Sequence, residues 1–147
     1  MGYVRWEDFT PGGSGSWLTF TPTVTLVGGS GNTVPEYSTN SGRYLQIGKI
    51  IFVDILLDGD GGNEGAGTGQ INIALPKQAG ASIISSRSIC EGFFFTPSQF
   101  HPAITIAASG TTVQLSKFFD GGISTATGAD QSSTSRTIRL KFFYEID

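Results

Sequence analysis

Charge is scarce in this sequence. Charged residues make up 14% of its 147 positions, against about a quarter in an ordinary globular domain. Nine Lys and Arg against twelve Asp and Glu give a formal net charge of -3. Nucleic-acid binding requires clustered cations, and the group Arg136, Arg139 and Lys141 is typical of a solvated sheet face instead. We therefore expect no nucleic-acid partner.

Cysteine and histidine are nearly absent, with one of each, Cys90 and His101. A single cysteine excludes an intrachain disulfide. Cys90 has apolar neighbours, which indicates a buried strand position where a thiol behaves as a small apolar group. Its use as a nucleophile would need His101 beside it, and nothing in the spacing predicts that pairing. The sequence thus predicts no catalytic residue and no enzyme activity.

Long hydrophobic runs are missing as well. No segment reaches the roughly 18 consecutive apolar residues that a membrane span needs. The stretch Met1–Phe9 contains Glu7 and Asp8 and does not resemble a secretory signal. We expect no membrane partner, and a chain that stays in the cytoplasm of the cell that makes it until something else releases it.

The sequence contains none of the usual motifs for binding a metal ion or a cofactor. Residues 58–64 read DGDGGNE, but the sixth and twelfth places of a calcium loop hold Asn63 and Gly69 instead of the required Gly and Glu. The glycines of 65–69 are followed by neither Lys nor a helical pattern. Asp54 lies within an apolar run, where an outward-facing carboxylate is commoner than a buried one. We predict no cofactor and no metal, while the binding of a cation by loop 58–69 stays open.

Aromatic residues and glycine are abundant, with 11 Phe and 21 Gly. Apolar residues recur with a period of two, which indicates strands, and Gly-rich segments separate them. Turns are predicted at Gly48-Lys49 and Ser109-Gly110, and polar loops at 27–42, 58–69 and 121–135. The predicted strands cover 17–26, 44–47, 50–57, 71–75, 88–95, 103–108, 112–119 and 137–146. About eight antiparallel strands without helical periodicity predict an all-β, jelly-roll-like β-sandwich over residues 17–147.

Two strands suggest how the layers pack. The nearly continuous apolar run Ile50–Leu57 predicts a central strand that is buried on both faces. The last strand places Ile138, Leu140, Phe142, Tyr144 and Ile146 on one face, toward the core. Phe143 then points to the opposite side, and an exposed ring there predicts an oligomer interface.

A short arm precedes the sandwich. Residues 11–16 read PGGSGS, a flexible hinge by composition. Ahead of it, Tyr3, Val4, Trp6 and Phe9 make the segment more apolar than a solubilising tail requires. We predict that residues 1–16 form a docking arm whose four apolar residues bind a partner, the alternative being a disordered terminus.

Two stretches are more specific than composition. The first is Trp17-x-x-Phe20-Thr21-Pro22-Thr23, and the second is Gly42-Arg43-Tyr44-x-x-Ile47-Gly48-Lys49-x-x-Phe52-Val53, followed by Ile71-x-Ile73-x-Leu75-Pro76. Together they resemble a β-sandwich module of tailed-bacteriophage virion proteins, found in tail fibres, receptor-binding heads and small capsid-decorating proteins. Within it we expect Gly42 to allow a backbone turn, Arg43 to bind carbonyls or a carboxylate, and Phe52 and Val53 to enter the core.

The resemblance implies a structural protein of the virion. Modules of this kind are typically trimers, which would hide Phe143 against sister subunits. The absence of a repetitive shaft favours a head-decoration protein. Such a protein would lie on the capsid surface and bind the major capsid protein through its arm. The alternative is a receptor-binding or tail-fibre head that recognises a host cell-surface glycan through loops 27–42, 58–69 and 120–135.

Overall fold

A computed structural model describes the backbone of residues 16–59, 62–81, 87–88, 91–95, 99–107, 109–119 and 122–147. Side chains are described for residues 16–59, 62–81, 104–107, 109–118 and 122–147. Residues 1–15, Asp60 and Cys90 lie outside these ranges, as does the side chain of His101. The predictions that concern them therefore stay predictions.

More than half of the described residues lie in strands, which confirms the predicted all-β class. The only helix among them is one turn of 3₁₀ helix, η2 (Gly128–Gln131). The strands are β1 (Leu18–Phe20), β2 (Val24–Val27), β3 (Thr39–Ile47), β4 (Ile50–Gly59), β5 (Gln70–Ala74), β6 (Arg87–Ser88), β7 (Glu91–Phe95), β8 (Gln99–Ile106), β9 (Thr112–Phe119), β10 (Gly122–Thr125) and β11 (Arg136–Glu145).

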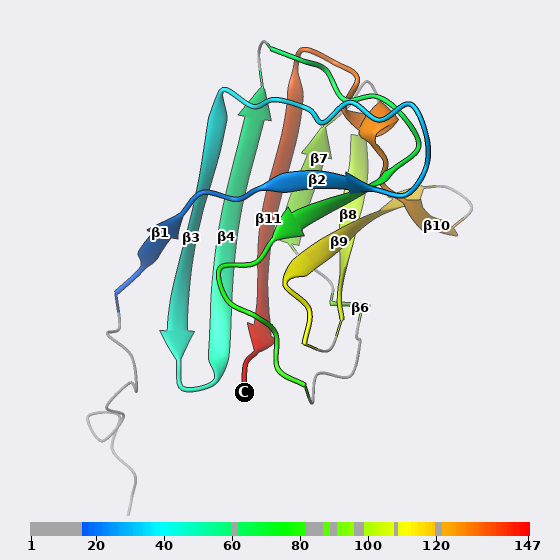
Figure 1. The fold of residues 1–147 in the computed structure, drawn as a ribbon. Coiled ribbons are helices and arrows are strands. Elements are labelled where there is room, and N and C mark those ends of the chain that lie inside the picture. Colours follow the sequence, from blue (N-terminus) through cyan, green and yellow to red (C-terminus); the bar gives the residue numbers. More distant parts are fainter. Residues whose placement is uncertain are drawn as a thin grey trace, which may run out of the picture.

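The strands are arranged in two layers whose pairings are all antiparallel (Figure 1). Sheet A has the order β1-β3-β4-β11-β7, and sheet B the order β8-β9-β5-β2 with β10 beside β9 and β6 beside β8. Strand β8 connects the layers, because Gln99 and Phe100 pair with β7 whereas His101–Ile106 pair with β9. Strands β2, β5 and β9 of sheet B cross in front of sheet A in this view, and the predicted sandwich is confirmed.

The last strand is inserted into the middle of sheet A. β11 pairs with β4 over ten residues and with β7 over five. The chain also changes layer between β1 and β2, between β2 and β3, and again between β4 and β5. These crossings, with the final strand between two earlier ones, produce the jelly-roll-like topology.

The predicted turn at Gly48-Lys49 joins β3 to β4. Ile47 pairs directly with Ile50, so the loop has two residues, and Gly48 adopts φ +58°. A two-residue hairpin requires such positive φ values, which glycine adopts without strain. The prediction for Gly42 is wrong, because this residue lies within β3 instead of at a turn. A Cβ there would meet the ring of Phe20 at 2.5 Å, so glycine makes room for the ring.

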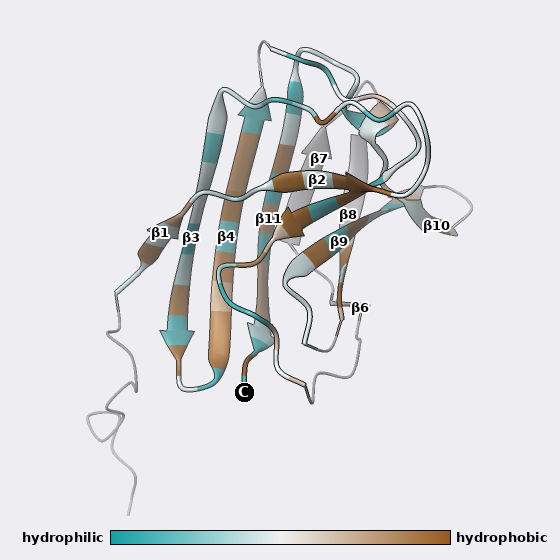
Figure 2. Ribbon diagram, viewed as in Figure 1, coloured by the Kyte–Doolittle hydropathy of each residue, from teal (hydrophilic) through white to brown (hydrophobic). Residues whose placement is uncertain are grey.

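The core lies between the two sheets and takes alternate residues of each strand. On β11 the predicted face is buried, including Ile138 and Leu140, while Phe143 points away from it. On β4 the prediction of burial on both faces is wrong. Ile51, Val53, Ile55 and Leu57 face the core, whereas the residues between them lie on the outer side of sheet A. Figure 2 shows β4 apolar over most of its length, so hydropathy alone does not divide this strand into an inner and an outer face.

Several segments that were predicted as loops contain regular structure. β3 begins at Thr39 and β4 extends to Gly59, so both adjoining loops are shorter than predicted. Segment 121–135 contains β10 and η2. These elements have few apolar residues, which is why a reading based on apolar alternation missed them. At the predicted turn before β9, Gly110 N–H donates to the carbonyl of Ala107 and Ser109 adopts φ +54°.

Arg136 is fully buried, which corrects its expected place on a solvated sheet face. Its guanidinium donates hydrogen bonds to the carbonyls of Ser133 and Glu36 and lies 5.6 Å from the ring centre of Tyr37. The Tyr37 hydroxyl donates in turn to Gln131 at 3.0 Å. Burial raises the pKa of Tyr37 above its usual value, and the charge of Arg136 opposes that rise. Because its guanidinium is hydrogen-bonded to these carbonyls, the charge of Arg136 is tolerated at the end of the core.

A second buried tyrosine joins the layers at the opposite end of β11. The Tyr144 hydroxyl donates to the carbonyl of Lys77 at 2.7 Å and accepts from the Lys77 N–H at 3.2 Å. Burial raises the pKa of Tyr144 to about 12, the hydrogen bond from Lys77 lowers it, and the nearby Tyr44 raises it. The neutral phenol is thus the form that fits the folded state.

We expect Tyr144→Phe to lower the free energy of unfolding by about 1–3 kcal/mol, because both polar groups of Lys77 lose their partner. Urea denaturation measures this change. Tyr44→Phe is the matched control, since its hydroxyl makes no hydrogen bond within the described residues, and it should change stability by less than about 0.5 kcal/mol.

The pH dependence of stability in the parent and in Tyr144→Phe gives a second test. The folded pKa of Tyr144, about 12, exceeds the unfolded value of 10, so the contribution of this group is complete below pH 10 and is lost as pH rises toward 12. The parent should therefore lose more stability over this interval than Tyr144→Phe does. Equal losses in the two proteins would contradict the assignment.

Candidate functional site

The outer face of sheet A carries an exposed aromatic pair. Phe52 on β4 and Phe143 on β11 are directly opposite in the ladder, with ring centroids 6.0 Å apart. Their exposed fractions are 38% and 62%. Leu45 on β3 is opposite Phe52 on its other side and extends this apolar row across a third strand. Phe143 lies where the sequence predicted it, whereas Phe52 was wrongly assigned to the core.

A charged row runs parallel to the aromatic pair. Asp54 is flanked in the ladder by Arg43 on β3 and by Lys141 on β11. The Oδ2 atom of Asp54 accepts hydrogen bonds from Nη2 and Nε of Arg43, at 2.8 and 3.1 Å. The predicted binding of a carboxylate by Arg43 is therefore confirmed. Asp54 faces outward, and its side chain is 18% exposed.

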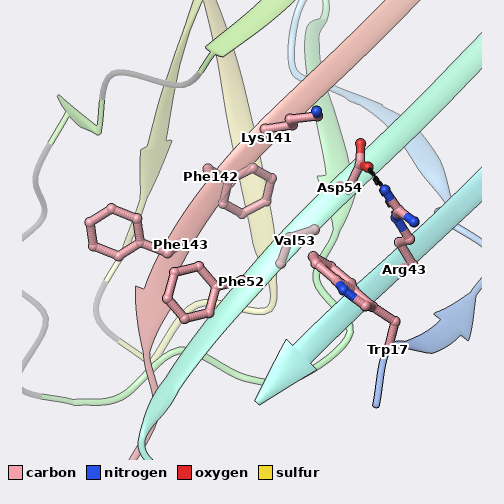
Figure 3. Close-up of a pocket in the computed structure, with 8 residues that line it drawn as sticks. All are labelled: Trp17, Arg43, Phe52, Val53, Asp54, Lys141, Phe142 and Phe143. Atoms are coloured by element: carbon pink, nitrogen blue, oxygen red, sulfur yellow. Dashed lines mark hydrogen bonds and ion pairs between the residues drawn. The ribbon is translucent and has the colours of Figure 1, made fainter. Parts of the chain in front are cut away.

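The two rows border a groove with a volume of about 380 Å³. Figure 3 shows the rings of Phe52 and Phe143 side by side and Arg43 joined to Asp54. The lining residues are Trp17, Arg43, Phe52, Val53, Asp54, Lys141, Phe142 and Phe143. The groove thus combines apolar rings with one carboxylate between two cations, a composition suited to binding an amphipathic surface.

Trp17 forms one wall of this groove. The guanidinium carbon of Arg43 lies 4.8 Å from the centre of its ring, a cation–π contact. The described chain begins one residue earlier, at Ser16, so the segment 1–15 joins the domain beside the groove. The predicted arm residues Tyr3, Val4, Trp6 and Phe9 lie outside the described residues, and their binding role stays a prediction.

A second groove lies along the loop before β3, within the predicted loop 27–42. Its volume is about 470 Å³. It is lined by Thr21, Pro22, Thr23, Val24, Val34, Pro35, Glu36, Tyr37 and Asn40. Glu36 is held in place, because its carboxylate accepts hydrogen bonds from the backbone N–H and the side chain of Asn63. This groove therefore has a polar wall that is fixed by loop 58–69.

The described residues contain no group that could hold a metal ion, because no three His, Cys, Asp or Glu side chains lie together among them. Asn63, in the loop considered for calcium, binds Glu36 instead. No helix of the described part is long and apolar enough to cross a membrane.

The comparisons with known proteins give no relative. No family model, curated protein or solved structure matches this chain.

Sequence reasoning missed the groove but not every residue in it. Trp17 belongs to one of the two sequence motifs and Arg43 was predicted to bind a carboxylate, yet nothing in the sequence places them beside Phe143. The missing information is register: Arg43, Asp54 and Lys141 align only when β3, β4 and β11 are paired. Residues 50–57 show no apolar–polar alternation, and Asp54 was the one signal of an outer face, which Phe52 shares because it lies two residues away on the strand.

We expect Arg43→Ala to uncover Trp17, because the ring loses the guanidinium that lies against it. In a Trp6→Phe background, the acrylamide quenching constant of Trp17 fluorescence should rise. Arg139→Ala is the matched control, since Arg139 is exposed on β11 and does not line the groove. Unchanged quenching in Arg43→Ala would mean that the contact does not hold the ring.

Proposed function

We propose that this protein is a bacteriophage head-decoration protein, a trimer that binds the assembled capsid through its N-terminal arm and stabilises it. The observation that carries the proposal is the outer face of sheet A. Apolar rings that a soluble monomer would bury are exposed there, beside the point where segment 1–15 joins the domain. Such a face suits a protein whose partners are other subunits.

The charge distribution supports an assembly role. Homomeric interfaces have an apolar centre with polar groups at the rim. The row of Leu45, Phe52 and Phe143 supplies such a centre, and the row of Arg43, Asp54 and Lys141 lies alongside it. The remaining motif residues build the fold: Gly42 accommodates a ring and Gly48 makes a hairpin turn. None of these features requires a reaction.

Binding energy would provide the stabilisation. A ligand that binds only the assembled shell stabilises it by RT ln(1 + [L]/Kd), or about 4 kcal/mol per site at a concentration of 1,000 Kd. The arm supplies four apolar side chains within seven positions, Tyr3, Val4, Trp6 and Phe9. Repeated over the shell, even a modest contribution from each site would oppose the internal pressure of the packaged genome.

Replacing Tyr3, Val4, Trp6 and Phe9 together by Ser should weaken binding to shells that lack this protein by at least about tenfold, which corresponds to about 1.4 kcal/mol. Sedimentation of the shells measures the bound fraction. The matched control replaces Arg5, Glu7 and Asp8 by Ser in an arm of the same length, and it should bind within about threefold of the parent. Normal binding by the apolar variant would contradict the proposal.

The second groove favours one other candidate function. A receptor-binding head would use loop 27–42, and this loop supplies Glu36, Tyr37 and Asn40 to a groove of about 470 Å³. Aromatic rings with a few fixed polar groups are typical of small-ligand sites. For this function the ligand would be a glycan of the host cell surface.

A glycan array separates the two functions. If the protein is a receptor-binding head, it binds defined glycans and Asn40→Ala abolishes the signal. Thr25→Ala, exposed on β2 outside the groove, should then leave the signal intact. For a decoration protein we expect no glycan signal in the parent, and electron micrographs of labelled virions should place the protein on the head.

A further inference from the structure

Strand β2 is an open edge of sheet B. It stands last in the order of this sheet, and among the described strands it pairs with β5 alone, over Val24–Val27. An edge strand leaves one side of its backbone without a partner, and proteins often protect such an edge with charged side chains. β2 reads VTLV and carries no charge. Its free side is therefore suited to pairing with another strand.

The hydrogen-bond pattern shows which groups of β2 are free. In an antiparallel pair, alternate residues direct both N–H and C=O to the partner strand. Ala74 N–H donates to the carbonyl of Thr23 at 2.9 Å, so Thr23, and with it Thr25, faces β5. The N–H and C=O groups of Val24 and Leu26 therefore point to the open side, where no backbone group of the described residues bonds to them.

The second groove lies along this open side. Residues 21–24 line one wall, residues 34–37 and Asn40 line the other, and no residue of β5 takes part. In Figure 1 the segment that leads to β3 returns on the side of β2 opposite to β5. The groove thus borders the free backbone groups of Val24. This is a setting for strand addition, in which main-chain hydrogen bonds supply affinity and the groove supplies specificity.

The walls of the groove indicate which side chains an added strand would carry. Residues directly opposite each other on paired strands direct their side chains to the same face. A residue opposite Val24 would thus point toward the core, against which Val24 and Tyr37 of the other wall both pack. Val34, also on that wall, is 45% exposed and adds apolar surface. Alternate residues of the added strand should therefore be apolar.

Glu36 is the only charged residue among those that line the groove. Its carboxylate has a fixed position, because it accepts hydrogen bonds from the backbone and the side chain of Asn63. The buried Arg136 binds the carbonyl of Glu36 and lines no part of the groove. A Lys or Arg of the bound strand would complement the carboxylate.

We infer that this groove binds an extended peptide, which pairs with the open edge of β2 at Val24 and Leu26. The peptide carries apolar residues at alternate positions and a Lys or Arg near Glu36. A strand matches the row of free backbone donors and acceptors, which a glycan would leave largely unused. The inference goes beyond the proposed function, since neither the arm nor the shell takes part in it, and either can fail without the other.

Selection from a random heptapeptide library displayed on bacteria tests the site. The full chain is the bait. Val24→Pro serves for counter-selection, because it removes a free N–H at a position where an edge strand tolerates proline. We expect enriched peptides to have alternate apolar residues and a Lys or Arg. No enrichment by the parent over Val24→Pro, with equal circular dichroism of the two proteins, would overturn the site.

N-methylated forms of an enriched peptide test strand addition on the parent protein, so this measurement does not depend on the folding of a variant. Only one alternate set of N–H groups in an added strand faces β2. Methylation of that set should weaken binding in fluorescence polarisation by at least about tenfold, and methylation of the other set should leave it within about threefold. Equal effects of the two sets would overturn the inferred pairing.

Glu36→Gln tests the charge. It should weaken binding of the enriched peptide by about threefold or more, and it should not affect a peptide whose cation is replaced by norleucine. Glu64→Gln is the matched control, since Glu64 is exposed and outside the groove. Binding of glycans without any peptide would overturn the inference in favour of the receptor-binding alternative. A lower oligomer mass of Val24→Pro, without peptide enrichment, would overturn it in favour of a second copy at β2.

Discussion

The pairing of β11 with β4 is the constraint on which the rest of the structure depends. Ten consecutive residue pairs join these strands in the middle of sheet A. The pairing fixes which residues of both strands face sheet B, because a shift by one residue would exchange the two faces. Ile55 opposite Leu140 then lies in the core, while Phe52 opposite Phe143 lies outside it. The hydrophobic core and the exposed aromatic pair are two results of one register.

The two faces of sheet A therefore have different physical roles. The inner face stabilises the fold by burying aliphatic side chains that account for most of the core. The outer face adds little to the stability of an isolated domain, and the ion pair of Arg43 with Asp54 is partly exposed, a setting in which such pairs contribute at most about 1 kcal/mol. Its apolar rings become stabilising only when another surface covers them. This difference is why the proposed association is assigned to the outer face.

Much of the fold could be predicted from the sequence, because strands have a two-residue period. The two-residue period predicted the core face of β11 and the layered all-β class, and the pair Gly48-Lys49 predicted the β3–β4 turn. Three features could not be predicted. The run Ile50–Leu57 is apolar except at Asp54, so its inner and outer faces become clear only from its pairing with β3 and β11. Arg136 is buried where it binds the carbonyl of Glu36, from a distant loop, as well as that of the nearby Ser133. Gly42 is required by the ring of Phe20, a partner that sequence position does not disclose. The groove depends on register in the same way.

The central position of β11 also has a consequence for synthesis on the ribosome. β4 and β7 are made well before residues 136–145, and among the described strands β11 alone lies between them. At about 5–20 residues per second, the inner edges of these two strands stay open for some seconds, during which they can pair with a nascent neighbour. Translation speed across the second half of the message should therefore influence how much of the newly made chain becomes native.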